Sequence, residues 1–347
     1  MKVIIDKDIK HFEDIIIALE GMDKINFIYL HQDEINNKTI KDAEVLFVRS
    51  ATRVDKFLLK NTQIKIVGSA TAGHDHIDSK FLIKKNIKWF HAPGCNAFSV
   101  INYVLSSIAY LKKAKLFNKN DNVGIVGCGN IGLGLKKALD KLSISNFSYD
   151  PYLDLDFLSD LNQIKNTSLI SLHVPYTKTG KFPTHNMINS KFIKDIENKI
   201  LINTSRGGIV SEQEIIKNNK LRYISDVWEN EPVPTKDIIN YSLISTPHIA
   251  GHSYNGKING TIFLIKELQR YIKLSSEIQK NNIDTINNNF LNTKTTKTYK
   301  LDDYLEAYNI KDESDNFKLT YEHSSDNEFS KTFKKRRKSH PYRKDIY

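Results

Sequence analysis

The sequence predicts an α/β protein in which a doubly wound domain with a parallel sheet is inserted into a smaller α/β domain. Three observations support this prediction. Short apolar, strand-like runs alternate with helix-like runs along most of the 347 residues. A G-x-G-x-x-G motif lies between one such strand and the helix that follows it. A long apolar run, residues 97–111, leads directly into that motif and therefore joins two alternating regions.

The first alternating region contains five strand-like runs and one clear helix. The strands are expected at residues 3–5, 27–30, 45–48, 64–67 and 88–90, and the helix at residues 11–19. The second region contains six strand-like runs, which are enough for a complete doubly wound sheet. These runs are residues 123–126, 146–149, 169–172, 200–203, 222–226 and 243–246. A helix over residues 257–273 is expected to return to the first domain, which makes that domain discontinuous.

The glycine motif has the context that a dinucleotide-binding turn requires. The strand at residues 123–126 ends at Gly127, and an amphipathic helix follows Gly132. Gly127 permits a tight turn, Gly129 lets the backbone approach a pyrophosphate, and Gly132 lets the helix pack close to the strand. Asp150, at the end of the next strand, is placed to accept hydrogen bonds from a ribose. A flexible loop is the alternative, but the flanking elements favour a cofactor. The candidate contacts are Gly127, Gly129, Asn130, Ile131, Gly132 and Asp150.

These features predict four segments along the chain. Residues 1–94 form the first part of the smaller domain, and residues 95–251 form the dinucleotide-binding domain. Residues 252–280 contain the return helix. Residues 281–347 contain a linker rich in Asn, Lys, Thr and Ser, followed by a polar C-terminal segment.

Composition favours a cytoplasmic protein. The chain contains two cysteines, so there is no disulfide framework to read. No apolar run approaches the length that crosses a bilayer, and the N-terminus starts on a strand-like pattern without a signal peptide. We therefore expect neither a membrane partner nor an export signal.

Three loops that follow predicted strands carry residues suited to acid–base chemistry. Arg206 lies on a glycine-flanked turn, and its planar fork suits a carboxylate. Glu231 follows a strand that ends at Asp226, and His248 lies between a proline and a glycine. A histidine oriented by a carboxylate can take a proton from a hydroxyl. A turn-capping surface arginine and a structural histidine are the alternatives.

Four motifs together identify a family resemblance. The stretches GCGNIG, NTSRGG, DVWENEP and TPHIAGH resemble those of the D-isomer-specific 2-hydroxyacid dehydrogenases, in order and spacing, over roughly residues 1–280. The resemblance implies NAD as cofactor, with Asp150 favouring NAD over NADP. It also implies a flavodoxin-like fold for the smaller domain, a small C-terminal α+β dimerisation segment, and a homodimer.

The resemblance also implies roles for individual residues. Arg206 would hold the substrate carboxylate, His248 would be the acid/base, and Glu231 would orient His248. Val174, Asp226 and Gly251 would line the nicotinamide side. Ser50, Thr71 and His252 are the candidate substrate-binding residues, although His252 stands where the family usually has a tyrosine.

Three further stretches point to a phosphorylated 2-hydroxy acid as substrate. Residues 48–52, 68–78 and 92–97, the last reading APGCNA, resemble one branch of the family. Arg49 and Arg53 are candidate phosphate partners from their charge and position, and solvated arginines on a turn are the alternative. Two other functions stay open: a phosphoglycerate or hydroxypyruvate dehydrogenase, and a non-catalytic NAD-binding regulator.

Two other features carry less weight. His74 and His76 flank an aspartate, but this spacing makes a poor metal site, and we expect no metal. The net charge of +11 is concentrated in residues 331–347, which contain eight Lys or Arg and one Asp. Such a run can bind nucleic acid. A solvated helix at a dimer interface is favoured instead, because the rest of the chain is close to neutral.

Overall fold

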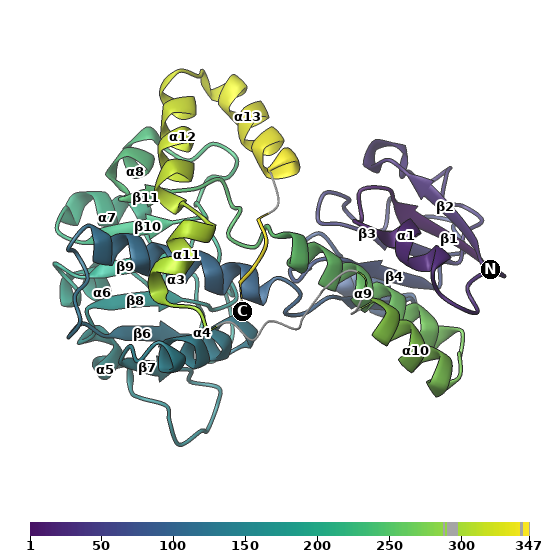
Figure 1. Cartoon of the computed structure of the whole chain (residues 1–347). Helices are drawn as coiled ribbons and strands as arrows, with labels where there is room; N and C mark the ends of the chain where they lie inside the picture. Colours follow the sequence, from purple (N-terminus) through teal and green to yellow (C-terminus); the bar gives the residue numbers. More distant parts are fainter. Residues whose placement is uncertain (287–288, 290–297, 341–342, 347) are drawn as a thin grey trace. The chain divides into compact units, whose positions relative to one another are not determined.

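The chain divides into two compact units. The computed structural model describes residues 1–286, 289, 298–340 and 343–346. The first unit comprises Met1–Asn96 and Ser253–Lys297, and the second comprises Ala97–His252 and Thr298–Tyr347 (Figure 1). The chain thus leaves the first unit, builds most of the second, returns to the first and ends in the second.

The first unit is built on a five-stranded parallel sheet with the order β2-β1-β3-β4-β5. This is the flavodoxin-like order, which changes direction between β1 and β3. The strands are β1 (Lys2–Asp6), β2 (Asn26–Leu30), β3 (Val45–Val48), β4 (Ile66–Ser69) and β5 (Lys88–His91). The helices are α1 (Phe12–Ile17), η1 (Gln32–Glu34), α2 (Ser79–Lys84), α9 (Tyr254–Tyr271) and α10 (Ser276–Ile286).

The second unit is built on a six-stranded parallel sheet with the order β11-β10-β9-β8-β6-β7. Its direction changes between β6 and β8, where doubly wound sheets bind ligands. The strands are β6 (Val123–Val126), β7 (Asn146–Tyr149), β8 (Leu169–Leu172), β9 (Ile200–Asn203), β10 (Arg222–Ser225) and β11 (Ile244–Ser245). The helices between the strands are α4 (Asn130–Lys141), α5 (Leu161–Lys165), α6 (Ser190–Asp195), α7 (Glu212–Asn218) and α8 (Lys236–Tyr241), and α3 (Ala97–Lys113) precedes them.

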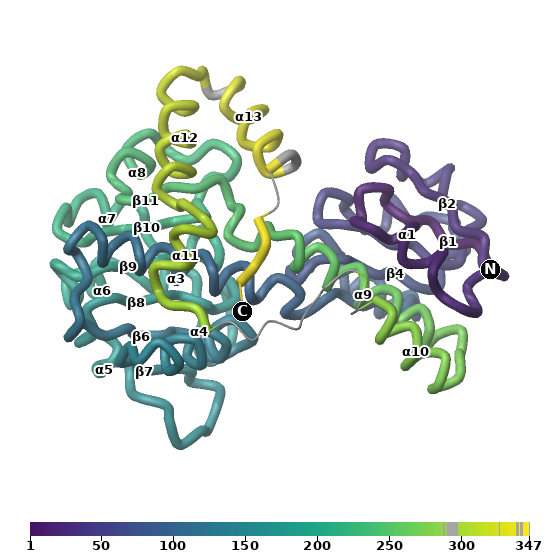
Figure 2. The backbone as a smooth tube through the Cα atoms, in the orientation of Figure 1, coloured from purple at the N-terminus to yellow at the C-terminus, as the bar shows by residue number. Residues whose placement is uncertain are grey.

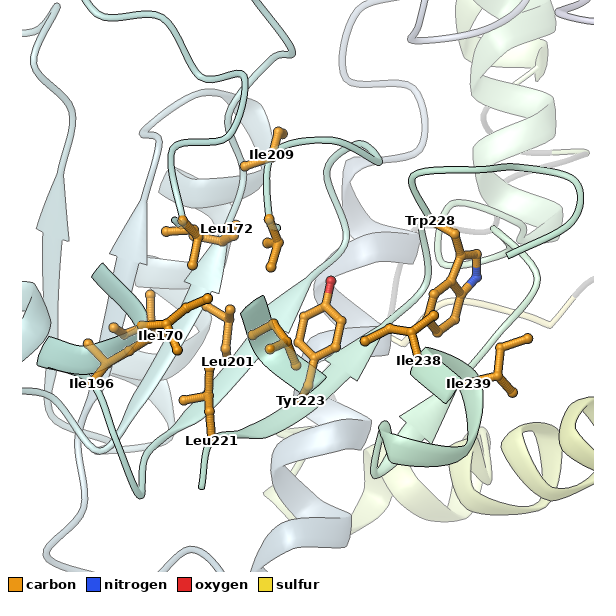
Figure 3. Packing of buried hydrophobic residues seen from close by; sticks show 14 of the residues in the cluster. Ile170, Leu172, Ile196, Leu201, Ile209, Leu221, Tyr223, Trp228, Ile238 and Ile239 are labelled. Atoms are coloured by element: carbon orange, nitrogen blue, oxygen red, sulfur yellow. The ribbon is translucent and has the colours of Figure 1, made fainter. Parts of the chain in front are cut away.

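Apolar side chains cover both faces of this sheet. All four residues of β6, of β8 and of β9 are buried, as expected for parallel strands with helices on each side. One buried cluster includes Leu201, Tyr223 and Trp228 (Figure 3). The other includes Ile125 and Ile202, which pack with the side chains of α3. The two predicted α/β layers are therefore confirmed.

The C-terminal segment folds onto the second unit as three helices. These are α11 (Leu301–Ala307), α12 (Ile310–Glu322) and α13 (Asp326–Ser339), and α12 and α13 form a hairpin (Figure 2). Between residues 298 and 339, all of which are described, no strand forms where an α+β segment was expected. The reason is the spacing of the apolar side chains: Phe317 and Tyr321, like Phe329 and Phe333, are four residues apart and are buried on one helical face.

Element boundaries differ from the predicted ones by a few residues. The return helix α9 begins at Tyr254 because the side chain of Ser253 accepts a hydrogen bond of 3.0 Å from the Gly256 N–H. The strand expected at residues 64–67 forms at Ile66–Ser69 instead. No helix in the described part of the chain is both long and apolar enough to span a bilayer.

The packing of the C-terminal helices on the second unit is testable at Phe317. This side chain is fully buried and its ring stacks 6.5 Å from that of Trp228. Phe317→Ala should lower the free energy of unfolding of the second unit by about 3–5 kcal/mol, because it leaves a cavity. Leu319 on the same helix is 53% exposed, so Leu319→Ala should change the free energy of unfolding by less than about 0.5 kcal/mol.

Urea titration in a Trp89→Phe background measures both variants, since Trp228 is then the one fluorescent tryptophan. Equal effects of the two substitutions would contradict the observed packing of α12.

Candidate active site

In the glycine turn after β6, Gly127 and Gly132 pack closely against other backbone atoms, whereas Gly129 has free space beside it. Gly127 has a φ of +95°, and a Cβ there would lie 2.6 Å from the carbonyl oxygen of His173. A Cβ at Gly132 would lie 1.9 Å from the Gly127 carbonyl oxygen. A Cβ at Gly129 would meet no heavy atom within 4 Å, and Gly129 caps the N-terminus of α4. This arrangement fits the pyrophosphate of a dinucleotide.

Other predicted cofactor residues surround this turn. Asp150 follows β7, and its carboxylate accepts a hydrogen bond of 2.9 Å from the Cys128 N–H. The carboxylate is thereby fixed beside the turn, and its remaining lone pairs are suited to ribose hydroxyls. Val174 follows β8 and lies against Gly127, because a Cβ there would be 2.9 Å from Val174 Cγ1. Asn130, at the start of α4, is exposed.

Ile131, the second residue of α4, is partly buried and packs against the hydrophobic cluster that contains Ile125. Its side chain therefore holds the helix N-terminus in place, and a cofactor would meet its backbone rather than its apolar side chain.

Arg206 lies on a turn that packs closely against the backbone of Trp228 and Glu229, in the segment before Glu231. Its Nη1 donates a 2.8 Å hydrogen bond to the Ser205 carbonyl, and the Ser205 hydroxyl donates one of 2.6 Å to the Leu172 carbonyl. A Cβ at Gly207 would lie 1.8 Å from the Trp228 carbonyl oxygen, so only glycine allows this approach. The guanidinium is half-buried at the carboxyl end of β9, in the second unit.

A hydrogen bond joins His248 and Glu231. His248 Nδ1 lies 2.8 Å from Glu231 Oε2 and 3.1 Å from Oε1. The two side chains are 29% and 22% exposed. Burial would raise the pKa of Glu231, but the charge and hydrogen bond of His248, with help from Arg337 and the Trp228 N–H, lower it below the usual range. Glu231 is therefore a carboxylate that fixes the imidazole.

Asp226 holds the loop that carries His248. Its buried carboxylate accepts hydrogen bonds from the Ile249 N–H (2.7 Å), the Ala250 N–H (2.9 Å) and the Thr246 hydroxyl (2.6 Å). Burial raises the pKa of Asp226, and these donors and His248 counteract that effect. His248 itself has a φ of +58°, a left-handed conformation that needs such support. Sequence reading suggested a cofactor contact here and missed this positioning role.

Two arginines of the C-terminal segment lie close to this part of the site, one beside Glu231 and one beside the His248 loop, and neither was among the predicted site residues. Arg337 Nη1 lies 3.8 Å from Glu231 Oε2. Arg343 donates a 3.2 Å hydrogen bond to the Ile249 carbonyl. Both arginines lie in the polar tail, almost a hundred residues after the loop, where local spacing carries no information about long-range contacts.

Gly251 and His252 end the segment of the second unit that contains this loop, and both are partly buried. The His252 ring lies 6.3 Å from the ring of His340, in an edge-to-face arrangement. His252 is therefore placed between the loop of His248 and the C-terminal segment.

The remaining predicted substrate residues belong to the first unit. Ser50 is exposed on the turn after β3. Thr71, after β4, bonds to the Ser69 hydroxyl at 2.7 Å and donates to the Gly73 carbonyl at 2.9 Å. The Ser69 hydroxyl also lies 3.0 Å from His76 Nε2. Burial lowers the pKa of His76 to about 4, so its ring is neutral at pH 7.

The two candidate phosphate partners differ. Arg49 Nε lies 3.0 Å from Asp6 Oδ2, and its Nη2 lies 2.6 Å from Asp8 Oδ2. Arg49 therefore already pairs with the carboxylate of Asp6, at the end of β1, and with that of Asp8, in the loop that follows. These ion pairs argue against Arg49 as a phosphate ligand. Arg53 is largely exposed and pairs with Asp55 at 3.2 Å.

Comparisons with known proteins show the family to which the chain belongs. Residues 109–250 match the family model described as D-isomer specific 2-hydroxyacid dehydrogenase, NAD binding domain. The curated erythronate-4-phosphate dehydrogenase of Wigglesworthia glossinidia brevipalpis is 42% identical over 284 residues, which cover 78% of this chain and 73% of that protein. That of Coxiella burnetii (strain RSA 331 / Henzerling II) is 38% identical over 257 residues, covering 71% and 70%.

A solved structure has the same fold. The NAD⁺-bound 3-phosphoglycerate dehydrogenase of Entamoeba histolytica matches with a TM-score of 0.65 and 23% identity, over 79% of this chain and 95% of that one. The motifs, the two parallel sheets and the curated relatives lead to one conclusion: this chain belongs to the erythronate-4-phosphate dehydrogenases, within the D-isomer-specific 2-hydroxyacid dehydrogenases.

Proposed function

We propose that this chain oxidises erythronate 4-phosphate at C2 with NAD, giving (R)-3-hydroxy-2-oxo-4-phosphooxybutanoate, as a step in vitamin B6 biosynthesis. The observation that carries the proposal is the 2.8 Å contact of His248 Nδ1 with Glu231, in a chain 42% identical to a curated erythronate-4-phosphate dehydrogenase. A regulator that only binds NAD would not require an imidazole oriented by a carboxylate.

His248 takes the proton of the substrate hydroxyl. Because Nδ1 faces Glu231, Nε2 is the nitrogen that accepts this proton. Glu231 is ionised, so it stabilises the imidazolium that forms. NAD accepts the hydride from C2 when it is bound. Loss of the proton from oxygen and of the hydride from carbon together converts the alcohol to a ketone.

Arg206 binds the substrate carboxylate. The guanidinium offers two parallel N–H donors, which suit a carboxylate and also polarise the neighbouring 2-oxygen. The proposal assigns Ser50, Thr71 and His252 to the rest of the substrate.

The cofactor contacts follow the glycine turn and the carboxyl ends of the strands. Gly129 and the N-terminus of α4 would hold the pyrophosphate, and Asp150 the adenosine ribose. Val174 and Gly251 would line the nicotinamide side. Asp226 would contribute to that side through the loop that it fixes.

A homodimer and a cytoplasmic location belong to the same proposal. Both come from the family resemblance and from the low cysteine content. Sedimentation of the purified chain tests whether it is a homodimer, and a monomer at micromolar concentration would overturn that part of the proposal.

The substrate assignment predicts a clear order of activities. NAD reduction followed at 340 nm should be fastest with erythronate 4-phosphate, and much slower with 3-phosphoglycerate and with glycerate. Preference for 3-phosphoglycerate would indicate the alternative dehydrogenase. Binding of NAD without turnover of any of the three acids would indicate a non-catalytic protein.

Replacement of the base should separate chemistry from binding. His248→Asn should lower kcat by about 10²–10⁴-fold, because the general base is lost. Its affinity for NAD should stay within about twofold, since the glycine turn is unchanged. His323→Asn, at an exposed histidine after α12, is the matched control and should keep full activity. Normal turnover by His248→Asn would contradict the assignment.

Glu231→Gln should change the pH dependence of oxidation in a defined direction. The lowered pKa of Glu231 means that it is ionised throughout the working range. Without that charge the positive charge that forms on the ring is less stabilised, so the acid limb of kcat/KM moves down in pH. The plateau should also fall, by about 10–100-fold, because the ring is less well oriented and is a weaker base. Glu322→Gln, at an exposed site, should leave the profile unchanged; an acid limb that moves upward in Glu231→Gln would refute the pairing.

A further inference from the structure

Arg343 is a buried arginine that donates to backbone carbonyls around the catalytic loop. The residue as a whole is 9% exposed. Nη1 donates to the Ile249 carbonyl at 3.2 Å, and Nη2 donates to the Ser99 carbonyl at 2.9 Å and also to the Ala250 carbonyl. The guanidinium carbon lies 4.3 Å from the centroid of the Tyr308 ring, which covers it with an aromatic face.

Both the N–H and the carbonyl groups of Ile249 and Ala250 are therefore hydrogen-bonded. Asp226 accepts hydrogen bonds from the N–H groups of Ile249 and Ala250, and Arg343 donates to their carbonyl groups. These two residues directly follow His248, whose left-handed backbone determines where its ring points. Asp226 and Arg343 together hold residues 249 and 250 in place, and this segment in turn positions the imidazole of His248.

The tail that carries Arg343 is itself anchored to α3. Asn102 donates a 3.0 Å hydrogen bond to the Ile346 carbonyl and accepts one of 2.9 Å from the Ile346 N–H. The Ser99 hydroxyl donates to Asp345 at 3.1 Å. With these contacts the backbone after Arg343 is held against a buried helix, so the guanidinium is already in position before any ligand binds.

We propose that Arg343 is a positioning residue for His248, so that a residue of the C-terminal segment affects the rate of proton transfer in the active site of the same chain. The proposal rests on the proposed function in that His248 is the base. It assigns Arg343 no contact with substrate or cofactor. Its effect runs through the Ile249 and Ala250 carbonyls to the φ of His248.

Arg343→Ala tests the proposal, with Lys344→Ala as the matched control. Lys344 is the neighbouring residue and is exposed. In Arg343→Ala, kcat for erythronate 4-phosphate should fall about 10–100-fold while the affinity for NAD changes by less than about twofold. Lys344→Ala should match the wild type. Arg343→Lys should lie between the two, because lysine keeps the charge but loses the planar fork.

Chemical rescue separates positioning from general destabilisation. Millimolar guanidinium chloride should restore part of the lost kcat of Arg343→Ala, whereas sodium chloride at equal ionic strength should not. Guanidinium should give no recovery in His248→Asn. Undiminished kcat in Arg343→Ala would overturn the proposal, and so would a loss of kcat that no guanidinium restores and that is matched by a loss of NAD affinity.

Amide hydrogen exchange gives a readout that needs no substrate. In Arg343→Ala, or in Arg343→Lys where the alanine variant does not fold, the Ile249 and Ala250 amides should exchange faster than in the wild type. The amides of β6 should be unchanged. Unchanged exchange at residues 249 and 250 would overturn the proposal. If the wild type does not turn over erythronate 4-phosphate, the proposed function fails, and the exchange result alone decides the role of Arg343.

Discussion

The proposed catalytic geometry depends on the hydrogen bonds that the buried carboxylate of Asp226 accepts. Three donors from residues 246–250 converge on it, at 2.6–2.9 Å, in a setting where an unmatched carboxylate would be costly. These hydrogen bonds stabilise the observed arrangement of the loop, in which His248 has a left-handed backbone conformation and its ring contacts Glu231. The strained backbone of His248 is supported by hydrogen bonds from Asp226 to neighbouring residues of the loop, not by contacts of the imidazole itself.

The electrostatics of the site follow from the same loop. Glu231 receives the imidazole, the Trp228 N–H and the more distant charge of Arg337, so it stays ionised although it is largely buried. A carboxylate of this kind holds one imidazole nitrogen and stabilises positive charge on the ring. Arg206 is brought toward the same segment by Gly207, where any side chain would collide with the Trp228 backbone. Backbone packing thus places Arg206, Glu231 and His248 after the carboxyl ends of neighbouring strands of one sheet.

The sequence predicted those parts of the molecule that depend on neighbours along the chain. The strand at 123–126, its glycine turn and the helix after it were readable because residues within thirty positions determine them. The pairing of His248 with Glu231 was inferred from a resemblance, and the structure has that contact. The contacts of Arg343 and the burial of Phe317 were not readable, because they join the tail to a loop and a sheet far away in the sequence. Of the C-terminal helices only the basic run within α13 was expected to be helical, and α11 and α12 were missed because polar residues interrupt their apolar side chains.

The most direct test of the account is a crystal structure of the chain with NAD and erythronate 4-phosphate bound together. The account predicts His248 Nε2 within about 2.6–3.2 Å of the C2 hydroxyl oxygen, with Nδ1 on Glu231 and the substrate carboxylate on Arg206. It also predicts that Asp226 still accepts the hydrogen bonds of Ile249 and Ala250. A substrate whose C2 hydroxyl faces another side chain, with His248 turned away from it, would contradict the account.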